Sequence, residues 1–163
     1  MQALINHLSN YERYHTKMST KITHFIGVPL AIIPIFILFN WITFGVNGWF
    51  HLGISWLALI GLFVYYFLLD KELAIATTIG LIILNIIARL IGGNAPNWLG
   101  FKIMIIVFII AWAIQFLGHF LEGKKPALFD NLFQALIAPI FITTEIAFLL
   151  GKKADLKAKM KKL

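Results

Sequence analysis

The fold class is decided by the stretch Trp98–Phe120, WLGFKIMIIVFIIAWAIQFLGHF, in which Lys102 is the one charged residue. An apolar stretch of about 20 residues is long enough to cross the hydrocarbon core of a bilayer as a helix. Three more stretches meet this criterion, namely Phe25–Phe44, Leu52–Leu69 and Leu73–Ile91. Between them lie turn and loop residues, namely Gly45-Val46-Asn47-Gly48, Asp70-Lys71-Glu72 and Gly92 to Asn97. The sequence therefore predicts four transmembrane helices.

The composition of the chain is that of a membrane protein. Of the 163 residues, 60% are hydrophobic and 13% are charged. About a quarter of the residues in a typical soluble domain are charged, so lipid must surround much of this chain. The net charge is +7, but the basic residues lie between and after the apolar stretches. This pattern argues against nucleic acid as a partner and indicates membrane orientation and contact with membrane lipid.

We treat residues 1–163 as a single membrane-embedded domain. Residues 1–24 form a polar, amphipathic segment, and no small-residue cleavage site follows the first apolar stretch. This segment is therefore predicted to be retained and not to be a cleavable signal peptide. Residues 151–163 form a basic tail. The chain has no Cys, so any metal ion must be held by nitrogen or oxygen atoms.

A fifth apolar segment, Leu132–Leu150, differs from the other four because it contains polar residues and a central Pro139. A proline interrupts a helix, so we predict two halves that are each too short to span the bilayer. The segment would then form a re-entrant or interfacial helical hairpin. The expected fold is an all-α, polytopic membrane helical bundle of four transmembrane helices plus this hairpin.

The basic residues predict the orientation of this bundle. With four spans and a cytoplasmic N-terminus, twelve of the fourteen Lys and Arg residues lie on the cytoplasmic side, and Arg89 and Lys102 lie on the other. A fifth span would move the tail across the membrane and leave six against eight. Cytoplasmic loops are enriched in Lys and Arg, so we predict that both termini are cytoplasmic. A bacterial inner membrane is favoured over the endoplasmic reticulum because the chain is so short.

Candidate metal ligands gather on the predicted cytoplasmic side. His7, His15, His24 and His119 all fall there, whereas His51 lies at the opposite boundary. Glu122, Asp130 and Glu145 are also predicted on this side. Ionisable groups at membrane depth commonly mark functional sites.

Helical spacing places Gln115, His119 and Glu122 on one face of a helix. A His and a Glu three residues apart can bind the same metal ion. The alternative is that Glu122 is a solvated helix end and His119 an interfacial cap. A carboxylate at Glu145 among apolar neighbours must be paired, protonated or metal-bound.

The histidines of the N-terminal segment also allow either a functional or a purely structural interpretation. Tyr11 and His15 share one helical face, and Ser19 and Thr20 suggest a cap that opens a new helix with His24 in its second turn. The break would let both histidines point inward. The alternative is a surface amphipathic helix whose Tyr and His residues lie among the lipid headgroups.

Other chemistries lack their motifs. The sequence has no Gly-rich phosphate loop, no G-x-S-x-G elbow and no H-E-x-x-H pair. Five scattered histidines are also too few for the clustered histidine boxes of the membrane desaturases that hold two iron ions.

Three ordered patterns in the sequence resemble the Fe(II)-dependent 2-hydroxy fatty acid dioxygenases, from about Tyr11 to Glu145. The patterns are Tyr11-x3-His15, His24-Phe25-Ile26-Gly27-Val28-Pro29-Leu30, and Gln115-Phe116-x-Gly118-His119-x2-Glu122-Gly123-x2-Pro126-Ala127-Leu128-x-Asp130-Asn131-x2-Gln134-Ala135-x2-Ala138-Pro139-x-Phe141. The third pattern is the most specific because it is long. The middle of the chain, residues 39–99, contributes hydropathy alone.

This resemblance implies an enzyme of fatty acid alpha-oxidation that removes one carbon from a long-chain 2-hydroxy fatty acid with Fe(II) and O2. It implies His15, His24 and His119 as iron ligands, with Glu122 or Glu145 as a fourth ligand or an orienting group. Residues expected to bind the substrate are Tyr11, Lys124, Asn131 and Gln134. Lys124 would receive the carboxylate at the membrane surface, although Lys124 and Asn131 also suit an orientation signal and a helix cap.

Two readings from other classes stay open at this point. A zinc-dependent membrane lipid hydrolase would use the same His and Glu donors. The second alternative is a protein without enzymatic activity, namely a small membrane transporter or scaffold. A transporter predicts a binding site at the bilayer midplane and an internal repeat, and the sequence shows neither.

Overall fold

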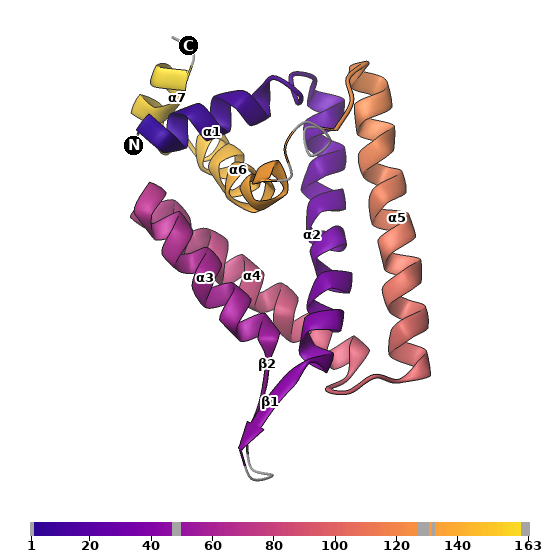
Figure 1. Cartoon of the computed structure of the whole chain (residues 1–163). Coiled ribbons are helices and arrows are strands. Elements are labelled where there is room, and N and C mark those ends of the chain that lie inside the picture. Colours follow the sequence, from indigo (N-terminus) through magenta and orange to yellow (C-terminus); the bar gives the residue numbers. More distant parts are fainter. Residues whose placement is uncertain (1, 47–49, 127–130, 132, 161–163) are drawn as a thin grey trace.

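Seven helices and one short β-hairpin make up the computed structural model, which describes residues 2–46, 50–126, 131 and 133–160 (Figure 1). The helices are α1 (Gln2–Glu12), α2 (Met18–Trp41), α3 (Ile54–Leu69), α4 (Lys71–Gly92), α5 (Trp98–Glu122), α6 (Phe133–Leu149) and α7 (Ala154–Met160). The strands are β1 (Thr43–Val46) and β2 (Phe50–Gly53). The predicted all-α helical bundle is confirmed.

Three of the described helices, α2, α4 and α5, are long and apolar enough to cross a membrane, with 24, 22 and 25 residues. Counting α6 and α7 as one bent span, with a bend of 115°, raises the number to four. The predicted span Leu52–Leu69 yields only the 16 residues of α3, because Leu52 and Gly53 belong to β2. A helix of that length covers about 24 Å, less than the roughly 30 Å of the hydrocarbon core.

The hairpin replaces the simple turn expected after the first span. The helix α2 ends at Trp41, and Thr43 and Phe44 enter β1, which pairs antiparallel with β2. Thr and Phe are residue types that favour strands over helices. Asn47 and Gly48 of the predicted turn lie outside the described residues, as does Trp49.

Pro139 does not divide the fifth apolar segment, in contrast to the prediction. The helix α6 continues through it from Phe133 to Leu149. Pro139 lacks the N–H that would donate to the Ala135 carbonyl, but apolar helices tolerate prolines where they pack against neighbouring helices, and Ala138 and Ile140 beside Pro139 are buried. The chain bends instead between α6 and α7, where Gly151 has φ 71° and Lys153 has φ 58°.

The helices α2 and α5 lie side by side along most of their length (Figure 1). Small residues at their interface permit this close approach. A Cβ at Gly118 would collide with Thr23, and one at Gly27 would lie 2.7 Å from Cγ of Gln115. Because the first turns of α2 meet the last turns of α5, His24 and His119 come together.

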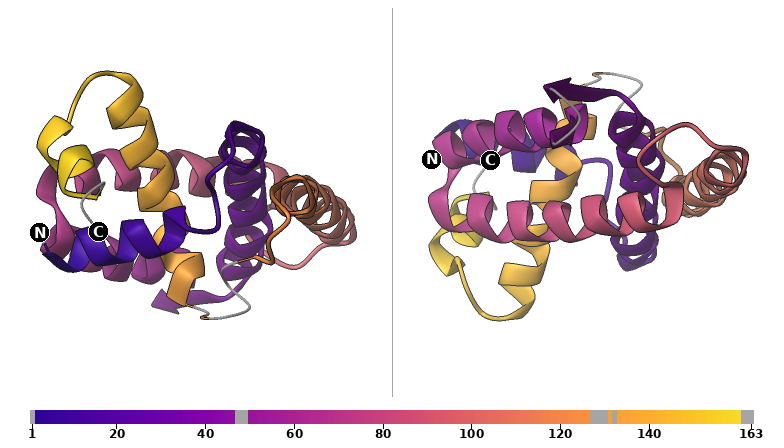
Figure 2. Two further views of the ribbon diagram at one scale, coloured as in Figure 1. Left: turned by 90° about the horizontal axis from the view of Figure 1, so that it is seen from above. Right: turned by 90° about the horizontal axis from the view of Figure 1, so that it is seen from below.

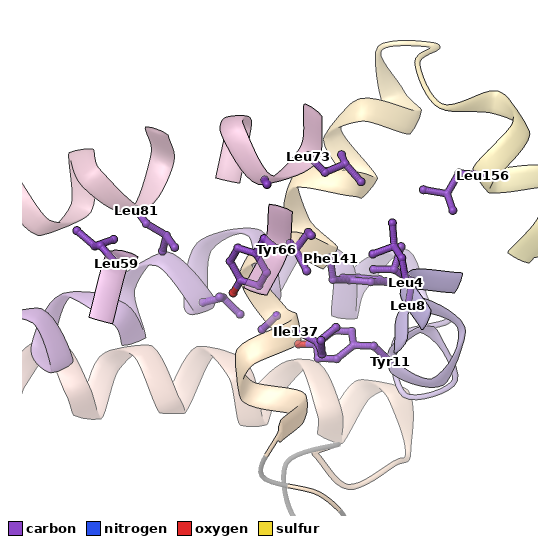
Figure 3. Close-up of a cluster of buried hydrophobic side chains, with 14 of the residues drawn as sticks. Leu4, Leu8, Tyr11, Leu59, Tyr66, Leu73, Leu81, Ile137, Phe141 and Leu156 are labelled. Carbon is purple, nitrogen blue, oxygen red and sulfur yellow. The ribbon is translucent and has the colours of Figure 1, made fainter. Parts of the chain in front are cut away.

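The short helices α1 and α7 pack with α6 at the same end of the bundle, where the two ends of the described chain also meet (Figure 2). The apolar side chains Leu4, Leu8 and Tyr11 of α1 are buried in this cluster, which also contains Phe141 of α6 and Leu156 of α7 (Figure 3). Since α1 is anchored by this core, the loop that follows it, with His15, is held over α2.

Candidate metal centre

Three buried histidines from three segments face one another at the end of the bundle that carries α1. The ring centroids lie 4.4 Å apart for His15 and His24, 5.0 Å for His15 and His119, and 4.8 Å for His24 and His119. One nitrogen of each ring lies within 4.8 Å of the others. In the described part of the chain this is the one group of metal-ligating side chains so arranged.

Backbone carbonyls orient two of the three rings. Nδ1 of His15 lies 2.7 Å from the Tyr11 carbonyl oxygen, and Nδ1 of His24 lies 2.9 Å from the Thr20 carbonyl oxygen. A carbonyl oxygen only accepts, so Nδ1 carries the proton in both rings and Nε2 keeps its lone pair. This is the arrangement by which metal-binding histidines are held in one tautomer.

Buried ligand atoms at this site have no protein partner. Among the described residues, Nε2 of His15 and Nδ1 of His119 make no hydrogen bond, and neither does Oε1 of Gln134. Unpaired buried polar atoms are rare and call for an explanation. Burial, together with the neighbouring His24, lowers the pKa of His15 to about 3, so the ring is neutral at physiological pH. Imidazole nitrogens with free lone pairs are suitable ligands for a transition-metal ion.

The aromatic ring of Tyr11 covers one side of the centre. It stacks on the His15 ring at 4.2 Å with an interplanar angle of 3°, and it contacts Phe141 at 4.6 Å. Burial raises the pKa of the Tyr11 phenol, so it stays protonated. Tyr11 and Gln134 both line the cavity that the histidines face.

The Glu122 carboxylate binds the loop that carries His15. It accepts the backbone N–H groups of Thr16 at 3.0 Å and Lys17 at 2.9 Å, and it also accepts the hydroxyls of Thr16 and Thr20. These donors sit at the start of α2, where the helix dipole favours a negative charge. Glu122 thus caps α2 from the end of α5, in place of the Ser19 and Thr20 cap predicted from the sequence.

Two lysines join the same pair of segments. Nζ of Lys17 donates to the Leu121 carbonyl at 2.7 Å, and Nζ of Lys124 donates to the Arg13 carbonyl at 2.6 Å. Each of the two segments thus donates a lysine hydrogen bond to a carbonyl of the other, which holds the loop with His15 against the end of α5. This clamp fixes the distance between His15 and His119.

Three other residues singled out in the sequence do not line the cavity beside the histidines. Glu145 pairs with Lys21 at 3.0 Å. Asn131 is exposed, and its side chain accepts the Phe133 N–H at 2.9 Å at the start of α6. Lys124 is exposed and engaged with Arg13. Catalytic or substrate-binding roles for these three residues stay predictions, and Asp130 lies outside the described residues.

Sequence reasoning missed Thr16, the bond from Thr20 to Glu122, and the role of Gly118 in letting α5 approach α2. The bond between Thr16 and Glu122 spans 106 positions of the chain. Spacing along the sequence carries no signal for such a contact. The i, i+4 spacing of Thr16 and Thr20 becomes informative only once the carboxylate opposite them is known.

A cavity of about 220 Å³ adjoins the three histidines. Its remaining walls come mainly from α2, α5 and α6 and are largely apolar, and they include Val28, Trp112 and Ala138. A few polar groups at one end of an apolar cavity are typical of a small-molecule site.

Residues 1–150 match the sequence profile of the family described as "2-hydroxy-palmitic acid dioxygenase Mpo1-like". The chain belongs to the Mpo1-like family. It is 33% identical over 159 residues to the 2-hydroxy-palmitic acid dioxygenase MPO1 of Saccharomyces cerevisiae, an alignment that covers 95% of this chain and 86% of the relative. No solved structure matches the chain.

The Mpo1-like match contains the whole candidate centre. Its 150 residues include the three histidines, Glu122 and the elements from α1 to α6. The helix α7 follows the matched region and packs on α1 without contributing to the cavity lining.

Proposed function

We propose that this chain is an Fe(II)-dependent dioxygenase that shortens long-chain 2-hydroxy fatty acids by one carbon. The observation that carries this proposal is the set of three buried imidazoles, two of them with unpaired nitrogens, at the polar end of an apolar cavity. Membership of the Mpo1-like family supports the same reaction and substrate class.

The proposed reaction needs no electron donor besides its substrate. R–CHOH–COOH and O2 give R–COOH, CO2 and H2O, so the C1–C2 bond breaks. The two carbons lose four electrons, which reduce one O2. This balance fits a chain whose sequence carries no motif for a redox cofactor.

Iron held by His15, His24 and His119 would keep open positions for O2 and for the hydroxyl and carboxylate oxygens of the substrate. The chain's own residues prepare this site. The Tyr11 and Thr20 carbonyls hold the His15 and His24 rings in the tautomer that binds metal. Tyr11 and Phe141 cover the His15 ring and keep water from it.

Glu122 acts in this proposal as a positioning residue, since four hydrogen bonds to α2 and its preceding loop occupy its carboxylate. The unpaired Oε1 of Gln134 would accept a hydrogen bond from the 2-hydroxyl group of the substrate. The histidine end of the bundle faces the cytoplasm, because most basic residues lie in the segments at that end. A bacterial inner membrane is the proposed location.

Turnover by the purified protein tests the proposal. We expect protein reconstituted anaerobically with Fe(II) to convert 2-hydroxypalmitate and O2 to the fifteen-carbon acid, as detected by mass spectrometry. Chelation of iron should stop the reaction. Unchanged 2-hydroxypalmitate despite near-stoichiometric bound iron would contradict it. Activity with zinc and an ester substrate would favour the hydrolase reading, since three histidines also form catalytic zinc sites.

Gln134 provides a test of how the 2-hydroxyl group is recognised. We expect Gln134→Leu to weaken the preference for 2-hydroxypalmitate over palmitate about tenfold, the effect of losing one well-placed hydrogen bond. Competition between the two acids during turnover measures this preference. Because Oε1 has no partner among the described residues, the variant should not lower the unfolding temperature.

Gln115→Leu is the matched comparison for this variant. Nε2 of Gln115 donates to the Gly27 carbonyl at 3.2 Å, so its loss should destabilise the contact between α2 and α5. An unchanged preference in Gln134→Leu would contradict the proposed role of Gln134.

A further inference from the structure

A stripe of side chains runs along one face of α2 away from the candidate metal centre. His24, Val28, Ala31 and Ile35 are spaced by about one helical turn, and all four line the cavity that the three histidines face. The polar end of the stripe is His24, and every later position in it is apolar. The stripe therefore continues the metal site into the hydrophobic part of the bundle.

The length of this stripe matches one leaflet of a bilayer. Eleven positions separate His24 from Ile35, which corresponds to about 16 Å at 1.5 Å per residue. The hydrocarbon core of a bilayer is about 30 Å thick, so one leaflet is about half of that. Ile35 is 47% exposed, so the far end of the stripe opens toward lipid.

The opposite wall comes from α5 and α6. Trp112 of α5 lies two turns before His119, and Ala135 and Ala138 of α6 complete the lining with small side chains. Ala31 is the small residue of the α2 stripe at its midpoint. Small residues on facing helices leave room for one chain between them.

A second groove borders the first but lacks its polar end. It has a volume of about 400 Å³ and shares Val28, Ile32 and Pro139 with the first cavity. None of the three histidines lines it. Its two hydroxyl groups, on Thr77 and Thr143, donate to carbonyls of their own helices.

We propose that the α2 stripe holds the acyl chain of the substrate, with Ala31 at the position where the groove limits chain length. This inference rests on the proposed function, because the reacting head group must lie at the three histidines. The chain would leave the metal centre along α2 and reach the bilayer beside Ile35 and Trp112. The second groove would remain filled by membrane lipid.

Filling the groove at Ala31 separates long from short substrates. We expect Ala31→Leu to lower kcat/KM for 2-hydroxyhexadecanoate about tenfold, since a few methylene groups in an apolar pocket carry discrimination of this size. The value for 2-hydroxyoctanoate should change less than about twofold, because Ala31 lies about 10 Å along α2 from His24. A structural defect would lower both values equally.

Two glycines provide matched controls. A Cβ at Gly61 of α3 or at Gly80 of α4 would meet no atom within 4 Å. Gly61→Leu adds the same side chain outside both grooves, and Gly80→Leu adds it in the second groove. Both variants should keep the wild-type ratio of the two kcat/KM values. A chain-length effect in Gly80→Leu, or equal loss for both acids in Ala31→Leu, would overturn the proposal.

Ligand-induced stabilisation tests the groove independently of turnover. The unfolding temperature of the anaerobic, iron-loaded protein should rise more with the sixteen-carbon acid than with the eight-carbon acid, and Ala31→Leu should remove the difference. This result without any product would reject the dioxygenase while supporting the groove. Equal stabilisation by the two acids, or none, would reject the groove.

Discussion

His119→Ala is expected to lower iron affinity by at least about 100-fold and to abolish turnover with it. Removing one of three imidazoles leaves two ligands for the ion, and changes in outer-shell partners alone already cost 10- to 100-fold. His15→Gln and His24→Gln should have the same effect, since each ring contributes one nitrogen to the group. Iron per chain, measured by elemental analysis, and oxidation of 2-hydroxypalmitate give the two readouts.

His7→Ala is the matched control for these variants. His7 lies on α1 and its Nε2 is 3.4 Å from the Tyr65 hydroxyl, away from the three rings. We expect it to retain iron and activity. Iron content and turnover that both survive His119→Ala would refute the metal centre, and an equal loss in His7→Ala would point to general unfolding.

Glu122→Ala is expected to lower the free energy of unfolding by about 3 kcal/mol and iron affinity by about 10- to 100-fold. The substitution leaves the N–H groups of Thr16 and Lys17 and the hydroxyls of Thr16 and Thr20 without their acceptor. Each unpaired buried donor costs about 1 to 3 kcal/mol, reduced here because Thr16 and Lys17 are partly exposed. Thermal unfolding and iron titration in lipid nanodiscs measure the two effects.

Glu122→Gln separates a positioning role from that of a metal ligand. The amide keeps one acceptor oxygen and the side-chain volume, so a positioning residue should lose part of both stability and iron affinity. A ligand would lose iron affinity with stability unchanged, which would contradict the present assignment. The side chain of Glu72 is 82% exposed, so Glu72→Gln is the control for the loss of one charge.

Glu145→Gln belongs in the same series, because the sequence assigned Glu145 the same roles as Glu122. Its pairing with Lys21 differs from the capping of α2 by Glu122. Loss of iron in Glu145→Gln at full stability would support a direct role for Glu145.

Hydropathy predicted α2, α4 and α5 well because the bilayer demands a minimum apolar length from any single spanning helix. It overestimated the helix in the second stretch, since it does not distinguish the strand β2 from the first turn of α3. The break predicted at Pro139 was also wrong, because α6 continues through this residue and packs against α1 and α4. Local patterns fail where packing against other segments changes the outcome.

Local sequence patterns were sufficient to predict an apolar helical bundle with His15, His24 and His119 at one end of it. Both conclusions rest on properties that short segments carry alone, namely apolar length and the position of charges. The folded chain was needed to show that these three rings face one another, that Glu122 caps α2, and that the α2 stripe adjoins them. These features depend on contacts between residues about a hundred positions apart, which arise from the packing of α2 against α5.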